Sequence, residues 1–96
     1  MGALAAELPP SVPVLTLATA AEVALRERGY TIIGRGTSAD VVELAAEAAS
    51  TGAVPRVLVR VTATPGGSLI VIKSGLLGDE TISRVILEAV LAKLGR

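Results

Sequence analysis

The feature that most constrains the fold is a hairpin pattern between residues 56 and 73. Arg56–Thr64 (RVLVRVTAT) alternates valine with other residues, which is the two-residue period of a strand with one buried face. The turn-forming sequence Pro65-Gly66-Gly67 follows, and Ser68–Lys73 (SLIVIK) supplies a returning strand. A chain with this pattern is expected to fold around an antiparallel strand pair.

The charges on this hairpin leave two interpretations open. With Gly66-Gly67 as the two-residue loop, Val61 is expected opposite Ile72, and Arg60 opposite Lys73 on the other face. Two like charges directly opposed destabilise a strand pair by up to about 1 kcal/mol. Either the register is shifted, or that face meets an anion or an acidic side chain.

A second stretch predicts a strand, a glycine turn and a helix. Tyr30–Ile33 is a short run of β-formers that Gly34-Arg35-Gly36 interrupts. Thr37 is the expected N-cap of a helix over Ser38–Ser50, whose backbone N–H groups would form an anion pocket with Arg35. The outer face of this helix would carry three acidic residues, Asp40, Glu43 and Glu47.

The N-terminal part has one ambiguous segment. Residues 1–11, which end in prolines, are expected to be an arm, and residues 12–96 a single small α/β domain. Val12–Ala18 fits a strand that precedes a helix over Thr19–Arg28, and it also fits a longer helix with Pro13 in its first turn. We favour the strand. Gly29 is expected to close the helix.

The last helix is expected to begin at Asp79 or Thr81 and to end near Leu94. Its apolar arc is wider than one sheet face can cover, in a chain that is 51% hydrophobic and only 19% charged. Burying four more aliphatic side chains would gain about 6–12 kcal/mol gross. We therefore predict a homo-oligomer whose interface uses one stripe of this helix, namely Leu87, Val90, Leu91 and Leu94.

Composition removes several function classes. Nine basic residues balance nine acidic ones, so no overall field attracts a polyanion. Cysteine and histidine are absent, which removes their metal sites, thiol chemistry and the usual general base. We expect no cofactor and no metal. No apolar run is long enough to span a membrane, and no secretory signal stands out, so a cytoplasmic location is expected.

The predicted class is α+β, a two-layer α/β sandwich in the order β-α-β-α-β-β-α with a C-terminal hairpin followed by a helix. The stretches that match a known family lie within about residues 14–74 and are Leu25-Arg26-Glu27-Arg28-Gly29, Ile33-Gly34-Arg35-Gly36, a helix with Val41-Val42 and Ala45-Ala46, and the valine hairpin. Over these residues the chain resembles the Alba-like family of stage V sporulation protein S. The resemblance implies a small oligomer that binds nucleic acid, with backbone contacts at Arg35, Gly36 and Thr37.

Three functions are compatible with these observations. The first is a non-enzymatic, self-associating module that uses the last helix and the outer sheet face. The second is a nucleic-acid binder, whose contacts would be Arg35, Gly36, Thr37, Arg56, Arg60 and Lys73. The third, an enzyme or small-anion site at Gly34–Thr37, ranks last because the sequence has no nucleophile–base pair and no complete phosphate motif.

Overall fold

The computed structural model describes residues 3–48, 56–74 and 80–95. It confirms the α+β class, with one five-stranded antiparallel sheet and two helices, but in a different order. In chain order the elements are β1 (Ala3–Leu8), α1 (Val14–Glu27), β2 (Tyr30–Thr37), β3 (Val41–Ala48), β4 (Val57–Thr64), β5 (Gly67–Ser74) and α2 (Glu80–Lys93).

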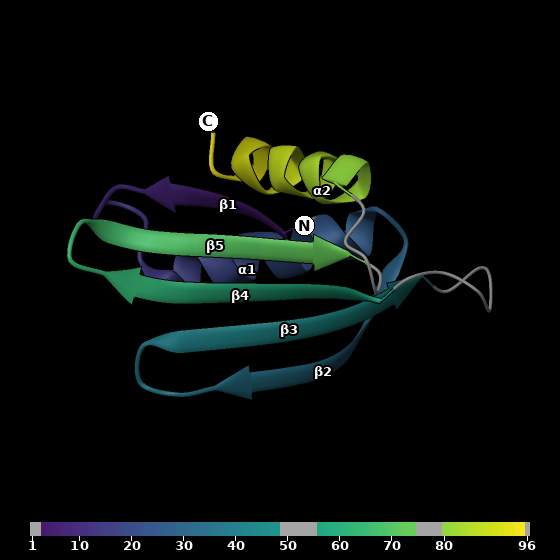
Figure 1. The fold of residues 1–96 in the computed structure, drawn as a ribbon, viewed down its shortest axis with the longest axis horizontal. Coiled ribbons are helices and arrows are strands. Elements are labelled where there is room, and N and C mark those ends of the chain that lie inside the picture. The colour runs from purple at the N-terminus through teal and green to yellow at the C-terminus, as the bar shows by residue number, and fades with distance from the viewer. Residues whose placement is uncertain (1–2, 49–55, 75–79, 96) are drawn as a thin grey trace.

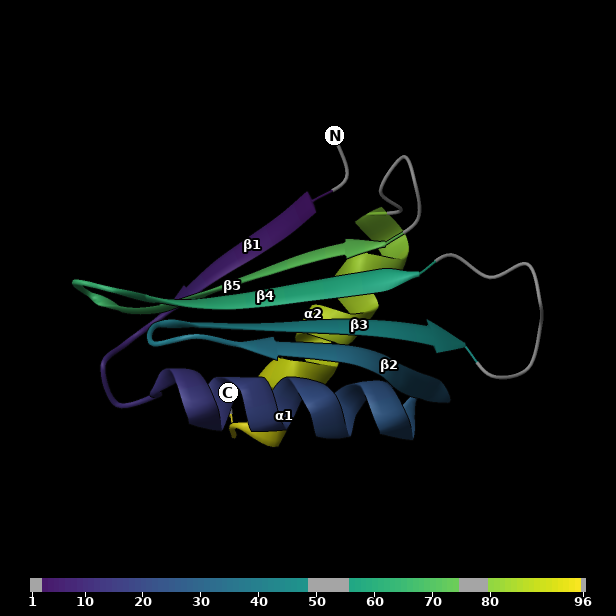
Figure 2. The same cartoon turned by 90° about the horizontal axis from the view of Figure 1, so that it is seen from below.

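The strands lie in the order β1-β5-β4-β3-β2, and every neighbouring pair is antiparallel. Strands β2 to β5 follow one another as a meander, and β1 joins it next to β5 (Figure 1). Both helices pack on the same side of the sheet, with α1 beneath the strands in Figure 2, so neither helix covers the opposite side, and no other element of the described residues does. We call that opposite side the open face.

The core lies between the sheet and the helices. Alternate strand residues point into it, and the most deeply buried of them are Val57, Val59, Val61, Ile70 and Ile72. From α1 and α2 the core receives Leu17, Ala21, Leu25, Ile86 and Val90. The buried hydroxyls are paired as well, since Ser74 Oγ lies 3.0 Å from Ser83 Oγ and Ser68 Oγ donates to the Val12 carbonyl at 2.9 Å.

The prediction of a strand over Val12–Ala18 is wrong, and the longer helix is the correct alternative. Helix α1 begins at Val14, and the Pro13 carbonyl accepts the hydrogen bond of the Leu17 N–H at 3.0 Å. Proline tolerates this position because its missing N–H would have no partner within the helix. Gly29 ends the helix with a φ of 89°, as its sequence position predicted.

The predicted helix over Ser38–Ser50 is also wrong where the structure describes it, because Val41–Ala48 forms strand β3. The same residues satisfy a two-residue period, with Val42, Leu44 and Ala46 inward and glutamates outward. Pairing on both sides, to β2 and β4, outweighs the helical preference of alanine and glutamate. The end of the predicted helix lies outside the described residues.

The β4–β5 hairpin is confirmed, with a register shifted by two residues. Thr64 pairs with Gly67, so the tight loop is Pro65-Gly66, and Val61 lies opposite Ile70. The shift keeps every side chain on its predicted face. It also separates Arg60 from Lys73, as the first interpretation expected, and Arg60 lies beside an acidic side chain, Glu43 of β3, as the second expected.

The residues expected to form an N-terminal arm contain β1, which pairs with β5 from Ala3↔Lys73 to Leu8↔Ser68. Leu8 is buried, and Leu4 and Ala6 point to the helical side with it. At the other end of the chain, α2 spans Glu80–Lys93, close to its predicted bounds. The predicted loop before it lies outside the described residues.

Candidate interaction surfaces

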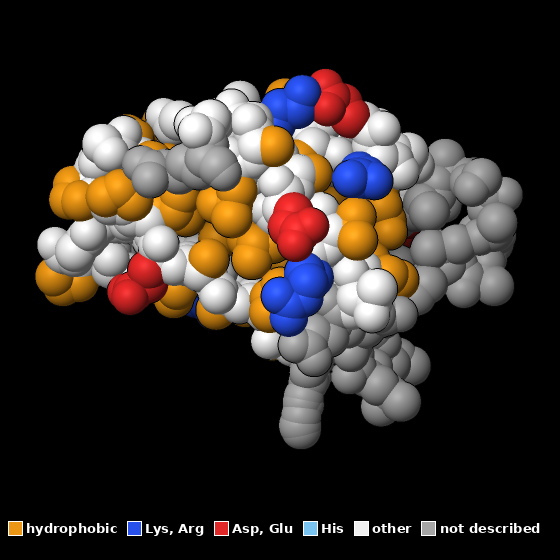
Figure 3. Space-filling view, turned by 90° about the horizontal axis from the view of Figure 1, so that it is seen from above, with side chains coloured by type: hydrophobic (Ala, Val, Ile, Leu, Met, Phe, Trp, Pro, Cys, Tyr) orange, Lys and Arg blue, Asp and Glu red, His pale blue; other side chains and the backbone are white. Residues whose placement is uncertain are grey.

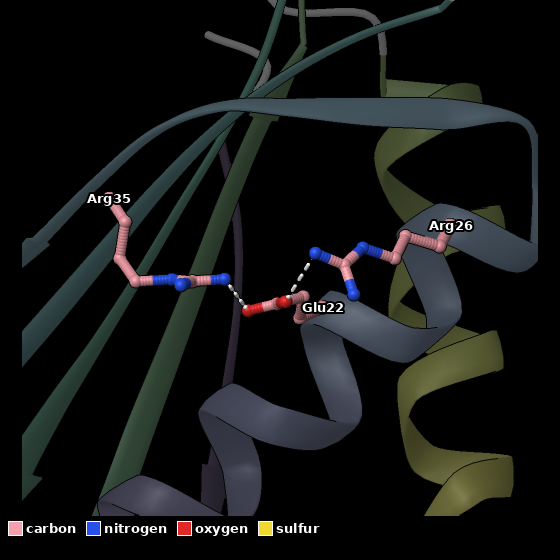
Figure 4. Close-up of polar contacts among 3 residues, drawn as sticks. All are labelled: Glu22, Arg26 and Arg35. Carbon is pink, nitrogen blue, oxygen red and sulfur yellow. Dashed lines mark hydrogen bonds and ion pairs between the residues drawn. The ribbon is translucent and has the colours of Figure 1, made fainter.

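The predicted anion pocket at Gly34–Thr37 is not a turn before a helix. These residues belong to β2, and Arg35 points to the helical side of the sheet. Its guanidinium donates a hydrogen bond to the Glu22 carboxylate on α1, which also pairs with Arg26 at 2.8 Å (Figure 4). Glu22 thus shares its single negative charge between Arg35 and Arg26, and it joins an edge strand to α1.

The open face carries a shallow hollow of about 430 Å³. Its lining comes from all four strands of the meander and consists of Gly34, Arg35, Gly36, Glu43, Leu44, Ala45, Leu58, Val59, Arg60, Val71 and Lys73. Three of the six predicted nucleic-acid contacts, Gly36, Arg60 and Lys73, therefore come together on the open face, whereas Arg35 borders the hollow with its side chain turned to the helical side. The other two, Thr37 and Arg56, are exposed and do not line it.

The charges of this face are sorted by strand. Arg60 on β4 lies 3.6 Å (Nε to Oε2) from Glu43 on β3, and both side chains are 60% exposed. Glu47 follows on the outward side of β3, and Lys73 projects from β5. The hollow thus has an apolar floor, a basic side along β4 and β5, and an acidic side along β3.

The predicted interface stripe on α2 is divided between different environments. Val90 is fully buried within the subunit, so its side chain is not at a surface. Leu94 lines a hollow of about 460 Å³ between the two helices, next to the exposed Leu15 and Val23. Leu87 and Leu91 are partly buried. Of the predicted stripe, Leu87 and Leu91 therefore remain candidates for a contact between copies of the chain.

Leu87 and Leu91 lie on the side of α2 that is turned away from α1. The side facing α1 is marked by Lys93, whose Nζ donates to the Glu27 carboxylate at 2.7 Å, and by Ile82, which lines a hollow with Arg28. Leu87 and Leu91 fall on the opposite flank at helical spacing. Because α2 packs on β5 and β1, whereas α1 packs on β2 to β5, we infer that this flank faces β1. We call the surface formed by β1, Leu87 and Leu91 the β1–α2 flank.

Figure 3 shows the side of the molecule formed by β1 and α2, where hydrophobic side chains gather in a broad patch with few charges among them. The sheet continues into this patch at the outer edge of β1, which pairs with no other strand in the part of the chain that the structure describes. Sequence reasoning missed this edge. The signal was the alternation of Leu4, Ala6 and Leu8 with Ala5 and Glu7.

The two sheet edges differ in their protection against pairing with another chain. On β2 the register shifts between Ile32 and Gly34, and Arg35 is a charged residue that points inward. A bulge and an inward charge are both features that discourage edge-to-edge association. Strand β1 has an unbroken register and, apart from Glu7, only alanine and leucine.

Neither α1 nor α2 has the length and apolar composition to cross a bilayer. Among the side chains that the structure describes, no three acidic residues gather into a group able to hold a metal ion.

No protein-family model matches this chain, and no curated protein matches it. The resemblance to the Alba-like family of stage V sporulation protein S remains a prediction. One of the residue groups behind it, Val41-Val42 with Ala45-Ala46, lies in strand β3.

Proposed function

We propose that this chain is a non-enzymatic, self-associating module in which two copies join edge to edge through the β1–α2 flank. The observation that supports this function is the contrast between the edges. The edge that lacks a bulge and an inward charge is the one beside the partly exposed Leu87 and Leu91. Pairing β1 with its copy would extend the sheet across both chains and cover these leucines.

The faces of β1 restrict the pairing register to those that oppose residues of the same face. Ala3, Ala5 and Glu7 lie on the open face, and Leu4, Ala6 and Leu8 lie on the helical side. Antiparallel strands keep both faces continuous only when directly opposed residues come from the same set. With Ala5 opposite its own copy on the two-fold axis, Ala3 lies opposite the partner's Glu7.

This register also brings oppositely charged side chains of the two copies close together. Lys73 lies beside Ala3 in the sheet, so its side chain can extend over the small alanine to the partner's Glu7. The two Cα atoms would be about 10 Å apart, two strand spacings, which the combined lengths of lysine and glutamate span. Two such pairs form around the axis. Each contributes at most about 1 kcal/mol because it is exposed, so they select the register more than they set the affinity.

The alternative function, nucleic-acid binding, is supported by one observation, since Gly36, Arg60 and Lys73 line the same hollow. Against it, Glu22 holds Arg35 and Glu43 holds Arg60. The whole chain has no net charge to attract a polyanion. We therefore rank nucleic-acid binding second.

Crosslinking tests the edge contact directly, because the chain has no cysteine of its own. In Ala5→Cys, two thiols would oppose each other across the axis with Cβ atoms about 5 Å apart. A short bifunctional maleimide is expected to convert this variant into linked pairs. Thr31→Cys, an equally exposed position on the β2 edge, is the matched control and should crosslink only at the rate of random collisions. Equal rates for the two variants would contradict the proposal.

A further inference from the structure

We infer that the open face is a second contact surface, separate from the β1–α2 flank, and that its occupant is another copy of this chain. The two copies would meet face to face about a two-fold axis that runs parallel to the strands, between β3 and β4. This axis places β4 of each copy over β3 of the other. The inference rests on two independent kinds of complementarity in the same patch, one of shape and one of charge.

In the middle of the open face, one large side chain, Leu58, projects beside a depression formed by two small residues. Leu58 on β4 is 47% exposed, although it lies in the middle of the sheet. The next residues along the same row are Ala45 on β3 and Gly34 on β2, which have almost no side chain, and all three line the hollow. The proposed axis brings each Leu58 over the partner's Ala45 and Gly34, so that two leucines enter two depressions.

The charges of the patch match under the same rotation. Arg60 lies one row along from Leu58, directly opposite Glu43 on the neighbouring strand. The rotation exchanges β3 and β4 and leaves each row of residues at the same position along the strands. Arg60 therefore lies over the partner's Glu43, and Glu43 lies over the partner's Arg60. An axis in the sheet plane but perpendicular to the strands would place β4 over β4, and it would lose this match.

The extent of the open face is compatible with a specific contact. Four strands of each copy, β2 to β5, overlap about this axis, and at about 4.8 Å between strands and about 3.3 Å per residue they give about 500 Å² per copy. The total of about 1,000 Å² is at the lower limit of specific protein interfaces. Packed sheets cross at about 30°, so the central rows with Leu58 and Arg60 would stay in contact while the corners diverge.

Charge reversal at Arg60 and Glu43 tests this contact through the mass of the assembly in solution. In Arg60→Glu or Glu43→Arg, two attractive contacts become repulsive, and the face-to-face contact is expected to weaken about 30-fold. An equimolar mixture of the two variants should recover the wild-type mass, because each glutamate introduced in one variant then meets the arginine introduced in the other. The pair within each chain stays mismatched in this mixture, so recovery would report on the contact between chains. Arg28→Glu, the same charge change at the C-terminal cap of α1, is the control and should leave the mass unchanged.

The two contacts give different masses, so their failures can be told apart. If both form, the two axes do not intersect, so the wild type is an open-ended array whose mass rises with concentration. Each single variant is then a two-chain assembly. If only the open face associates, the wild type has two chains and the variants have one. The inference is overturned if Arg60→Glu and Glu43→Arg keep the wild-type mass, or if their mixture does not recover it.

Discussion

Gly67→Ala is expected to lower the free energy of unfolding by at least about 3 kcal/mol. Gly67 has a φ of 142°, which side chains rarely adopt, and a Cβ built there would lie 2.0 Å from the Leu8 carbonyl oxygen and 2.7 Å from the Pro9 carbonyl carbon. Both obstacles are backbone atoms, so no side-chain rotation relieves the overlap. Urea denaturation, read as the shift of the unfolding midpoint, measures the loss.

Gly66→Ala is the matched control, one residue earlier in the same turn. Gly66 has no positive φ, and a Cβ there would meet nothing within 4 Å. Its unfolding free energy should stay within about 0.5 kcal/mol of the wild type. If both variants unfold at the wild-type midpoint, the end of β1 does not lie over the hairpin turn, and the placement of β1 at the sheet edge is wrong.

The double substitution Ala5→Lys/Glu7→Lys is expected to weaken the edge-to-edge contact about 100-fold. In the proposed register it opposes lysine to lysine at position 5 and brings Lys73 beside a lysine of the partner in place of Glu7. Three repulsive contacts of up to about 1 kcal/mol each, with two attractions lost, correspond to roughly two decades in the dissociation constant. Analytical ultracentrifugation over a dilution series measures it.

Thr31→Lys/Thr37→Lys adds lysines to the β2 edge and should leave the dissociation constant within about threefold of the wild type. All four substituted positions are exposed, so neither variant disturbs the core. An edge contact that survives Ala5→Lys/Glu7→Lys, or that is lost equally in both variants, would show that β1 is not where the copies meet.

The hairpin, the C-terminal helix and the end of α1 could be predicted because each has a local and specific cause. Valines at every second position of β4 are compatible with only one buried face. Pro65-Gly66-Gly67 predicts a tight turn, which makes the next strand antiparallel to β4. The exact register could not be predicted, since loops at Pro65-Gly66 and Gly66-Gly67 both put the same residues on the core face.

Strand β3 could not be predicted, because Val41–Ala48 satisfies two periods at once. Its glutamates at positions 43 and 47 fit one side of a helix, and with Val41 and Ala45 they also fit the outward side of a strand. The choice between them is made by β2 and β4, which pair with β3 on its two sides. The predicted glycine turn failed for the same reason, since Gly34 and Gly36 are outward residues of a paired strand.

The candidate surfaces were predicted in part. An apolar excess in α2 led to Leu87 and Leu91, but helical spacing alone did not separate them from Val90, which packs into the core. The convergence of Gly36, Arg60 and Lys73 depends on strand order, which no local pattern contains. Strand β1 was missed because short alternating alanine-rich segments are weak strand signals without a partner in view.

Sedimentation equilibrium of the wild-type chain, from about 1 µM to about 1 mM, tests the central claim of self-association most directly. A single chain has a mass of 9.7 kDa. If the copies associate as proposed, the mass is at least that of two chains at the upper concentrations and decreases on dilution as the contacts dissociate. A mass of 9.7 kDa at every concentration would contradict it.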